Sequence, residues 1–449
     1  MDMTSGRLGK QILFFSLPLI LSNLLQVCFN MSDIAVVGRF SGSAALGAVG
    51  STTILVTLFT GFLIGLGNGV NVLVARYLGQ KNDCAVAEAT HTSLIICLIS
   101  GMILCALGEI FSRPLLVALS TKPELMDGAL LYLKIYFLGM PALAVYNFGN
   151  AVLSAAGDTK RPLYYLSAAG LINVALNLVF VVGFGRSVDG VAAASVISQY
   201  LSAGLIVAFL ARCDEPYGLC CRLLKPNPRH SADILRLGLP SGFQNAIFAI
   251  ANLFIQAGVN SFDAITVAGN AAAANADPLV YDVMAAFYMA CASFMSRNFG
   301  AGKKSRIIKS FYISLAYSAG AGAVLGLGLV LFGRQFLTLF SKDAEVIAEG
   351  MARLRVMGFS YVVSAFMDCT IAASRGLGRT LVPTIIVILG SCVFRVAWIY
   401  TVFAHFHTIA SLYLLYAFSW AITAAAEIAY FAVVYKKIVR QLTFSDSVV

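Results

Sequence analysis

The stretch Arg76-Tyr77-Leu78-Gly79 has a counterpart at Arg297-Asn298-Phe299-Gly300, 221 positions later. Gly157-Asp158-Thr159 recurs as Gly378-Arg379-Thr380 at the same offset. Further matches lie at an offset of 221 or 222: Ser120 with Ser341, Glu124 with Glu345, Ile12-Leu13 with Ile234-Leu235, and Pro18 with Pro240. So many matches at nearly one offset predict that the chain contains two copies of one structural unit.

The composition predicts a membrane protein. Of the 449 residues, 59% are hydrophobic and only 12% are charged, whereas about a quarter of a soluble domain is charged. Unbroken apolar runs of about 20 residues, without alternation of polar and apolar positions, indicate membrane-spanning helices rather than a barrel. The basic residues lie between these runs, so the net charge of +10 does not indicate nucleic-acid binding.

The apolar runs predict twelve spans, six in each copy. They are expected at about 12–37, 46–72, 88–113, 131–155, 162–184, 188–212, 234–258, 264–295, 307–333, 353–375, 381–404 and 408–435. An even number of spans per copy gives both copies the same orientation, so the two lobes should be related by a pseudo-two-fold axis along the membrane normal. We expect an N-terminal lobe at 1–212, a polar cytoplasmic linker at 213–232 and a C-terminal lobe at 233–449.

The basic residues also predict the orientation in the membrane. If the N-terminus is cytoplasmic, 21 of the 31 Lys and Arg residues fall in inside segments and nine in outside segments, while Arg395 lies within a span. Because cytoplasmic loops are enriched in Lys and Arg, both termini are expected in the cytoplasm, with the chain in the cell (inner) membrane. The apolar run from Ile12 continues as a full span without a small-residue cleavage site, so no cleavable signal peptide is expected.

Polar side chains within the first copy predict an ion-coupling site. A carboxylate in the hydrocarbon core costs about 2.5 to 3.5 kcal/mol on insertion scales and therefore normally has a function. Asp33 is such a residue, and Asn173 and Asn177 share one helix face because they are four positions apart. With Ser195 they form an all-oxygen set suited to Na⁺ or to a protonatable Asp. The alternative is a hydrogen-bond network that only holds helices together.

Other polar residues within the spans are candidates for a substrate cavity. They are Asn30, Asn147, Asn150, Asp277, Tyr281, Asp282, Asp368 and Arg395. Asn147 and Asn150 could equally form hydrogen bonds that only hold neighbouring helices together. Asp368 and Arg395 carry opposite charges at similar depth, so a buried ion pair that fixes packing is the structural alternative for them.

No cofactor is expected apart from the coupling ion, H⁺ or Na⁺. The ten cysteines are scattered without metal or disulfide spacing, and His405 and His407 alone are weak evidence of a metal site. Gly65-Leu66-Gly67-Asn68-Gly69 lies inside a span with no preceding strand, which favours close helix packing over nucleotide binding.

Several motifs together are similar to those of one transporter family. They are Leu17-Pro18, Asp33 followed by Val37-Gly38, the loop Ala75-Arg76-Tyr77-Leu78-Gly79, and Gly157-Asp158-Thr159 ahead of Asn173 and Asn177. In this order they resemble the prokaryotic branch of the multidrug and toxic compound extrusion (MATE) family over roughly residues 10 to 435. The resemblance implies a V-shaped pair of six-helix lobes that exports lipophilic, often cationic, compounds in exchange for Na⁺ or H⁺.

The resemblance also implies roles for particular residues. Asp33, Asn173 and Ser195 match the cation site of the N-terminal lobe, but similar members carry a second Asp where this chain has Asn177. One carboxylate fewer makes Na⁺ binding less favourable and favours proton coupling through Asp33. Asn147 and Asn150 match amides of the fourth span.

We therefore expect a monomeric secondary antiporter in the lipid bilayer that exports small organic compounds. One alternative is a flippase for lipid-linked precursors from the same superfamily, but such proteins often have additional spans and basic cavities. A membrane-embedded enzyme is a less favoured alternative because the four histidines supply no catalytic pair.

Overall fold

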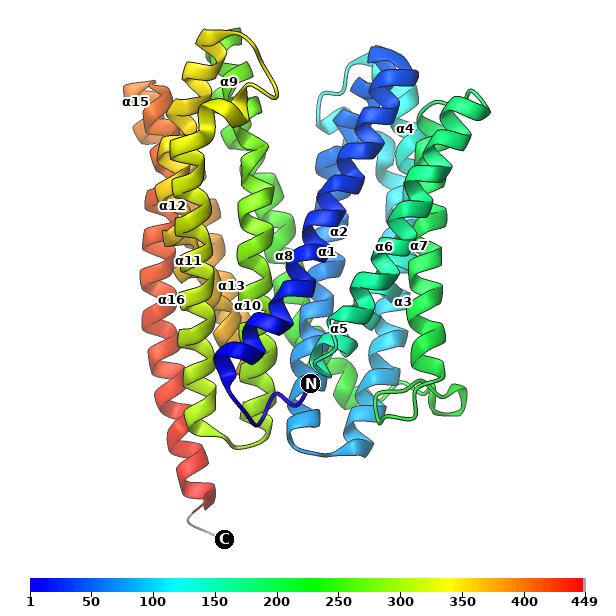
Figure 1. Cartoon of the computed structure of the whole chain (residues 1–449), viewed down its shortest axis with the longest axis vertical. Helices are drawn as coiled ribbons and strands as arrows, with labels where there is room; N and C mark the ends of the chain where they lie inside the picture. The colour runs from blue at the N-terminus through cyan, green and yellow to red at the C-terminus, as the bar shows by residue number, and fades with distance from the viewer. Residues whose placement is uncertain (447–449) are drawn as a thin grey trace. The chain divides into compact units, whose positions relative to one another are not determined.

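The computed structural model describes residues 1–446, apart from the side chains of Cys221 and of residues 441–446. Every regular element within these residues is helical, which confirms the expected all-α fold (Figure 1). The helices are α1 (Leu8–Phe40), α2 (Gly42–Gly79), α3 (Asp83–Ala118), α4 (Pro123–Phe137), α5 (Met140–Ala155), α6 (Lys160–Asn177), η1 (Leu178–Gly183), α7 (Val188–Ala211), η2 (Cys221–Leu223), α8 (Pro228–Val259), α9 (Ala264–Ala274), α10 (Ala276–Gly300), α11 (Lys304–Leu337), α12 (Ala344–Gly376), α13 (Leu381–Val387), η3 (Ile388–Val393), α14 (Phe394–Trp398), η4 (Ile399–Phe403), α15 (Ala404–Phe406) and α16 (Ile409–Asp446).

The membrane spans agree with the prediction of twelve. Within the described residues, 11 helical segments are long and apolar enough to cross a bilayer, and the pair α4 and α5, bent by 47°, makes the count up to 12. The bend lies at Gly139, where a Cβ atom would lie 1.9 Å from Oε1 of Gln199 on α7. Glycine leaves room for this side chain, and Pro141 lies in the first turn of the helix that follows.

The two halves of the chain interrupt different helices. The first copy breaks its fourth span at Gly139, whereas the equivalent helix α12 is continuous. The second copy breaks its second span at Asn275, between α9 and α10, whereas the equivalent helix α2 is continuous. Each half is therefore interrupted in a different span, although the helix order is the same.

The chain divides into two compact units, whose boundaries do not coincide with the two copies. Unit 1 contains Met1 and Leu21–Ala246, and unit 2 contains Asp2–Ile20 and Ile247–Val449. The first part of α1 thus packs with the second half of the chain, and the first part of α8 packs with the first half. The division of α1 falls just after Pro18, and that of α8 falls six residues after Pro240.

In unit 1, the start of α8 crosses α2 at paired glycines. A Cβ atom on Gly65 would lie 2.3 Å from the backbone nitrogen of Gly242, and one on Gly69 would lie 2.6 Å from that of Gly238. Small residues let helix backbones approach closely. The glycine-rich stretch of the sequence is therefore a helix-packing motif, as predicted.

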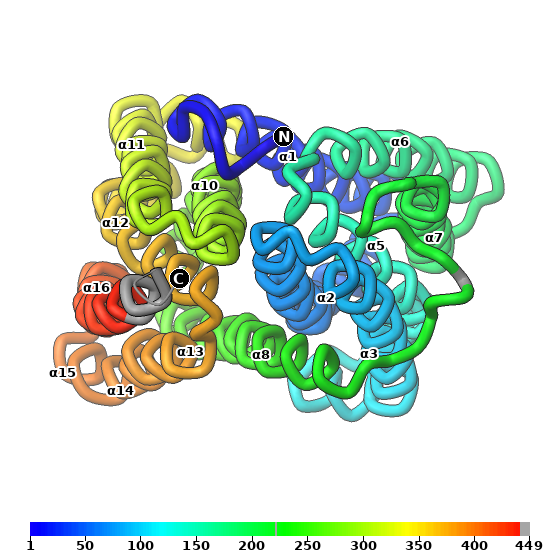
Figure 2. Tube along the Cα trace, turned by 90° about the horizontal axis from the view of Figure 1, so that it is seen from below, coloured from blue at the N-terminus to red at the C-terminus, as the bar shows by residue number. Residues whose placement is uncertain are grey.

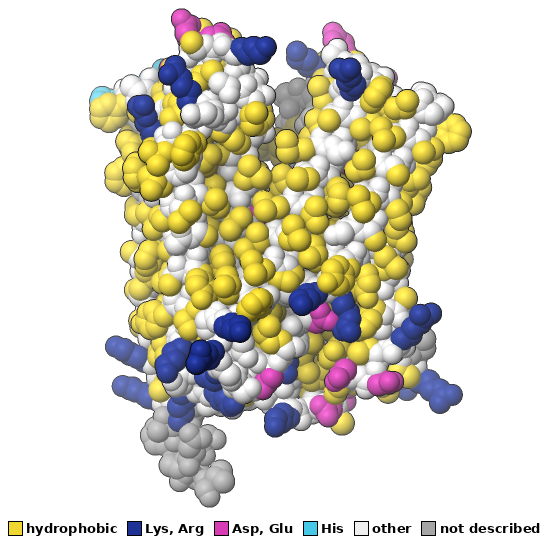
Figure 3. All heavy atoms as spheres, viewed as in Figure 1, with side chains coloured by type: hydrophobic (Ala, Val, Ile, Leu, Met, Phe, Trp, Pro, Cys, Tyr) yellow, Lys and Arg dark blue, Asp and Glu magenta, His cyan; other side chains and the backbone are white. Residues whose placement is uncertain are grey.

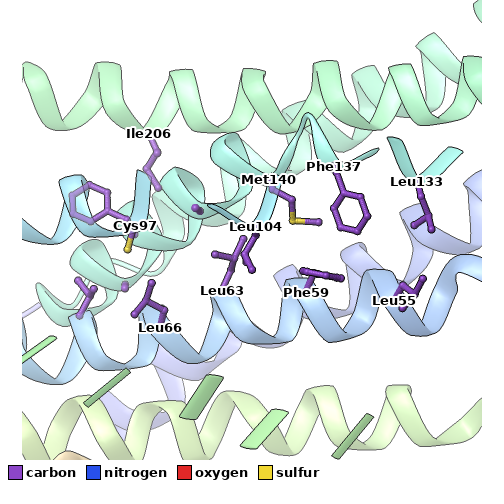
Figure 4. Packing of buried hydrophobic residues seen from close by; sticks show 14 of the residues in the cluster. Leu55, Phe59, Leu63, Leu66, Cys97, Leu104, Leu133, Phe137, Met140 and Ile206 are labelled. Atoms are coloured by element: carbon purple, nitrogen blue, oxygen red, sulfur yellow. The ribbon is translucent and has the colours of Figure 1, made fainter. Parts of the chain in front are cut away.

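The apolar core of unit 1 is formed by α2, α3, α4, α5 and α7 (Figure 4). Phe59 and Phe137 meet edge to face with ring centroids 4.8 Å apart, a favoured geometry for aromatic pairs. Gly108 makes room for them, because a Cβ atom there would lie 2.2 Å from the Phe137 ring. This packing fixes α4 beside α2 and α3.

In unit 2, α12 is the central helix and contacts α9, α10, α11 and α16 (Figure 2).

The N-terminal segment is held at the α10–α11 turn. The three guanidinium nitrogens of Arg306 donate to the backbone oxygens of Met3, Ser5 and Gly6 and to the side chains of Gln11 and Asn298. The beginning of α1 is therefore anchored by polar contacts as well as by apolar burial.

The polar stretch predicted as a linker packs against α3 in unit 1. The backbone N–H of Cys220 donates to Nε2 of His91 over 2.8 Å, and the side chain of Asn227 donates to Glu88 over 2.7 Å. His230 lies 3.3 Å from the same carboxylate. These contacts order the segment that leads into α8.

π-helical turns occur at equivalent positions of the two copies. η1 begins at Leu178, directly after Asn177, and η4 begins at Ile399, 221 positions later. A second π turn in the second half, η3, precedes Arg395. π turns are rare and are found frequently at functional sites.

The surface of each unit is consistent with a bilayer environment. On the face seen in Figure 3, apolar side chains cover the middle of both units, whereas Lys, Arg, Asp and Glu gather toward the two ends. This arrangement matches the prediction from composition.

Candidate transport sites

The predicted ion-coupling residues of the first copy come together in unit 1. Nδ2 of Asn177 donates to Oδ1 of Asp33 over 2.5 Å, and the hydroxyl of Ser195 donates to Oδ2 over 3.2 Å. Asn173 donates to the hydroxyl of Ser195 over 3.4 Å, and its own Oδ1 accepts from Asn177 over 3.3 Å. The four side chains therefore form one network around a single carboxylate.

Close packing between α1 and α6 positions this network. A Cβ atom on Gly170 would lie 1.9 Å from the ring of Phe29, so only glycine lets the two helices approach at this level. Asp33 lies one turn after Phe29, and Asn173 and Asn177 lie one and two turns after Gly170. The contact thus brings the carboxylate of one helix to the amides of the other.

The burial of the network differs from residue to residue. Asn177 is completely buried and Asn173 is 6% exposed, whereas Asp33 is only half-buried. Oδ1 of Asn177 has no hydrogen-bond partner among the described residues. Because a buried polar atom without a partner is costly, this oxygen is available to a ligand beside the carboxylate.

The remaining candidates of the first copy do not hydrogen-bond to Asp33. Asn30 is exposed on α1. Asn147 donates to the backbone oxygen of Leu143 over 2.9 Å, within its own helix. Oδ1 of Asn150 is buried without a partner among the described residues. Their assignment to a substrate cavity stays a prediction.

A second charged network lies in unit 2, at the break between α9 and α10. Nη2 of Arg353 lies 2.5 Å from Oδ2 of Asp277, and the hydroxyl of Tyr361 donates to Oδ1 of Asp277 over 2.6 Å. Arg353 also donates to Oδ1 of Asn270 over 2.6 Å. The helix break therefore has a buried ion pair with hydrogen bonds on both sides.

Sequence reasoning missed Arg353. We expected the span to begin at residue 353 and counted Arg353 among the outside charges, but α12 begins at Ala344 and Arg353 is only 6% exposed. The signal was present, because Asp343 followed by Glu345 is typical of a helix start. Asp343 indeed accepts the backbone N–H of Glu345 over 2.9 Å.

The possible ion pair between Asp368 and Arg395 is not formed. Asp368 accepts from the hydroxyl of Ser364 over 2.9 Å. Nε of Arg395 donates to Ser419 over 3.2 Å, and Nη1 donates to Asn252 over 3.3 Å. The structural alternative of an ion pair that fixes packing is therefore wrong for these residues, and the ion pair that does form, between Asp277 and Arg353, was not predicted.

Tyr281 and Asp282 lie on α10 near this interior. The Tyr281 ring packs edge to face against Tyr361 and Trp420, with centroids 5.6 Å and 5.9 Å away. Asp282 is partly buried. Within the described part of the chain, no group of three or more His, Cys, Asp or Glu side chains could hold a metal ion.

Comparison with known proteins identifies the family. A model of the MatE family matches residues 18–179 and 240–401, once in each copy. The chain belongs to the MatE family. MatE proteins are transporters, so the fold described above is that of a multi-pass membrane transporter.

Individual relatives are more distant. The chain is 28% identical to the probable multidrug resistance protein YpnP of Bacillus subtilis over 364 residues, and the aligned region covers 80% of each protein. It is 25% identical to the FAD transporter of Shewanella oneidensis over 350 residues, and this aligned region covers 76% of each protein. Among solved structures, the outward-facing conformation of a multidrug resistance MATE transporter superposes with a TM-score of 0.90 at 21% identity, covering 97% of this chain and 98% of that chain. This likeness shows that the fold is shared.

Proposed function

We propose that this MatE protein is a secondary antiporter that exports lipophilic, cationic or otherwise toxic organic compounds, and that Asp33 exchanges the coupling ion. The observation that carries the proposal is the network of Asp33, Asn173, Asn177 and Ser195 within one unit. Relatives named as multidrug resistance proteins support export of drugs. They favour this function over a flippase or an enzyme.

The donor geometry around Asp33 supports H⁺ as the coupling ion. Each carboxylate oxygen accepts a hydrogen bond from a side-chain donor, Asn177 on one side and Ser195 on the other. Protonation of Asp33 would remove its negative charge and add an O–H donor, which weakens the two charge-assisted hydrogen bonds that it accepts. A proton can thus change the contact between α1 and its neighbours α6 and α7.

Na⁺ is the second candidate, and the free Oδ1 of Asn177 favours it. A monovalent cation needs several oxygen lone pairs directed at one point. Asp33 and Asn177 could supply two of them, and Ser195 a third if its hydroxyl turns away from the carboxylate. The single carboxylate makes this site less favourable for Na⁺ than for H⁺.

A movement of α1 would connect the ion to the substrate. The part of α1 before Leu21 belongs to unit 2, whereas the part that carries Asp33 belongs to unit 1. Pro18, which lies beside this division, removes one helical hydrogen bond and weakens the helix there. Binding or release of the ion at Asp33 would bias the bending of α1 at this point.

The orientation and the oligomeric state are part of the proposal. The excess of Lys and Arg in alternate loops supports cytoplasmic termini in the cell membrane. The ion network is complete within one chain, which supports a monomeric transporter.

The proposed function is tested by efflux of a cationic dye such as ethidium from proteoliposomes, with the proton and Na⁺ gradients imposed separately. We expect a proton gradient to drive efflux by the unchanged protein and Asp33→Asn to abolish the gradient-driven part. Asp127→Asn is a matched control, because it also removes one carboxylate and Asp127 is exposed on α4. Gradient-driven transport by Asp33→Asn at the unchanged rate would overturn the assignment.

A further inference from the structure

Arg395 is buried in the interior of unit 2 and lies between two irregular turns. It is on α14, directly after the π turn η3 and shortly before the π turn η4, and is 2% exposed. Its guanidinium has five N–H donors. Two hydrogen bonds are formed by its nitrogens, to Ser419 and to Asn252.

Arg395 forms no direct ion pair with a carboxylate among the described residues. Asp368 interacts with it electrostatically, but this carboxylate is hydrogen-bonded to Ser364 within its own helix. In the described part of the chain, Nη2 of Arg395 has no hydrogen-bond partner. A buried cation without an anion in direct contact is costly in free energy, so an anionic group that reaches it would be bound favourably.

Aromatic rings surround the guanidinium on several sides. The Cζ atom of Arg395 lies 4.8 Å from the ring centroid of Tyr416, 5.4 Å from that of Phe248 and 5.8 Å from that of Trp420. These distances are typical of cation–π contacts. The rings stabilise the charge partly and also offer flat apolar faces beside it.

The site has an open side. Asn252, which accepts a hydrogen bond from Nη1 of Arg395, is exposed, and Phe248 and Tyr416 are only half-buried. A small molecule that reaches Asn252 is therefore adjacent to the guanidinium. The buried and the accessible sides of the site are provided by α8, α14 and α16.

We propose that Arg395 binds the carboxylate or phosphate of an aromatic substrate, with the aromatic part of the substrate packed against Phe248, Tyr416 and Trp420. The proposal rests on the proposed function, since it names a further substrate class for the same transporter. It extends the substrates from lipophilic cations to aromatic anions. The carboxylate or phosphate would accept from the unused N–H groups of Arg395, and such charge-assisted bonds are among the stronger hydrogen bonds in proteins.

The chain offers a direct probe of this site, because it contains only two tryptophans. In a Trp398→Phe background, Trp420 is the remaining one. Three pyrene compounds that differ in charge are titrated: pyrene-1-carboxylate, pyrenemethanol and pyrenemethylammonium. Energy transfer from Trp420 to pyrene measures binding of each compound next to Arg395.

We expect the carboxylate to bind about tenfold more tightly than the neutral alcohol and this preference to vanish in Arg395→Met. Arg395→Lys should retain part of it, because the charge remains while the planar fork is lost. Arg355→Met is the matched control, since Arg355 is exposed on α12. A carboxylate that binds no better than the alcohol, or a preference that survives in Arg395→Met, would overturn the proposal.

Two further measurements separate the remaining explanations. Thermal unfolding of Arg395→Met in detergent, followed by circular dichroism, shows whether the variant is folded, and efflux of ethidium by the unchanged protein tests the proposed function independently of the anion site. Titration in lipid discs with and without phosphatidylglycerol tests whether a lipid headgroup supplies the phosphate instead. The proposal of an aromatic substrate would be contradicted by two results together. One is that this lipid displaces the pyrene carboxylate, and the other is that acetate binds as tightly as the aromatic anion.

Discussion

Asp277 and Arg353 are joined by an ion pair of 2.5 Å at the point where the helix of the second span of unit 2 is interrupted. The two residues are far apart in the sequence, and only one of them was expected inside the membrane. Tyr361 and Asn270 complete their hydrogen bonding. The relationship stabilises an irregular backbone that would otherwise be unfavourable in the membrane.

Removal of one partner of this pair should destabilise the protein. We expect Asp277→Asn or Arg353→Met to cost about 3 kcal/mol, because the remaining charge is left buried without its partner. The double variant should recover part of the loss. Thermal unfolding in detergent, followed by circular dichroism, measures both effects. Single variants as stable as the unchanged protein would show that the pair does not stabilise the fold.

A second carboxylate at the ion-coupling site should change the ion dependence of transport. Asn177→Asp places an additional negative charge beside Asp33, which raises the affinity of the site for a cation. We expect efflux that is stimulated by Na⁺ in this variant, by about threefold or more if one additional carboxylate provides about 1 kcal/mol.

The matched control for this change is Asn260→Asp, because Asn260 is exposed and lies outside the candidate sites. Sodium stimulation in both variants would indicate a general effect of charge rather than a site at Asp33. Binding of radioactive sodium to the purified protein gives an independent measurement.

The glycine crossing of α2 with α8 should not tolerate a methyl group. Gly65→Ala would place a Cβ atom 2.3 Å from the backbone of Gly242, and such overpacking costs about 1 to 3 kcal/mol. Gly50→Ala is the control on the same helix, because nothing lies within 4 Å of a Cβ atom there. Since alanine favours helices over glycine, the control should be neutral or slightly stabilising. Equal melting temperatures of the two variants would contradict the close packing.

The anchored N-terminal segment should be released by removal of Arg306. Its guanidinium holds the backbone oxygens of Met3, Ser5 and Gly6. We expect Arg306→Met to increase the rate of tryptic cleavage after Arg7 by about fivefold, because local opening determines access of the protease. Lys309→Met, an exposed residue on the same helix, serves as the control and should leave this rate unchanged. Mass spectrometry of the first fragment identifies the cleavage site.

The sequence predicted the fold well because spans and repeats are properties of long segments. Apolar length and the repeated segments at Arg76 and Arg297, which end α2 and α10, are recognisable without tertiary information. The network at Asp33 was also predictable. A carboxylate within a span is costly and normally pairs with other polar groups, and the two amides on one helix face could supply them. Which function it serves still depends on the experiments above.

The partners in the second half could not be predicted for two physical reasons. Arg353 lies before the apolar run of its span, and hydropathy alone cannot show that a helix extends beyond that run. Opposite charge alone suggested Asp368 and Arg395 as a possible ion pair, but hydroxyl and amide side chains supply their hydrogen bonds instead, Ser364 for Asp368 and Ser419 with Asn252 for Arg395. Such partners depend on tertiary packing and cannot be read from charge.

The exchange of helix beginnings makes the two copies of the repeat depend on each other. The first part of α1 buries Ile12, Phe15 and Leu19 against α10 in unit 2, and the first part of α8 buries Ile234 and Leu237 in unit 1. Each copy thus supplies an apolar segment that is buried with helices of the other copy, as in a domain-swapped dimer. Separation of the two copies would expose both segments, so neither half is expected to fold without the other.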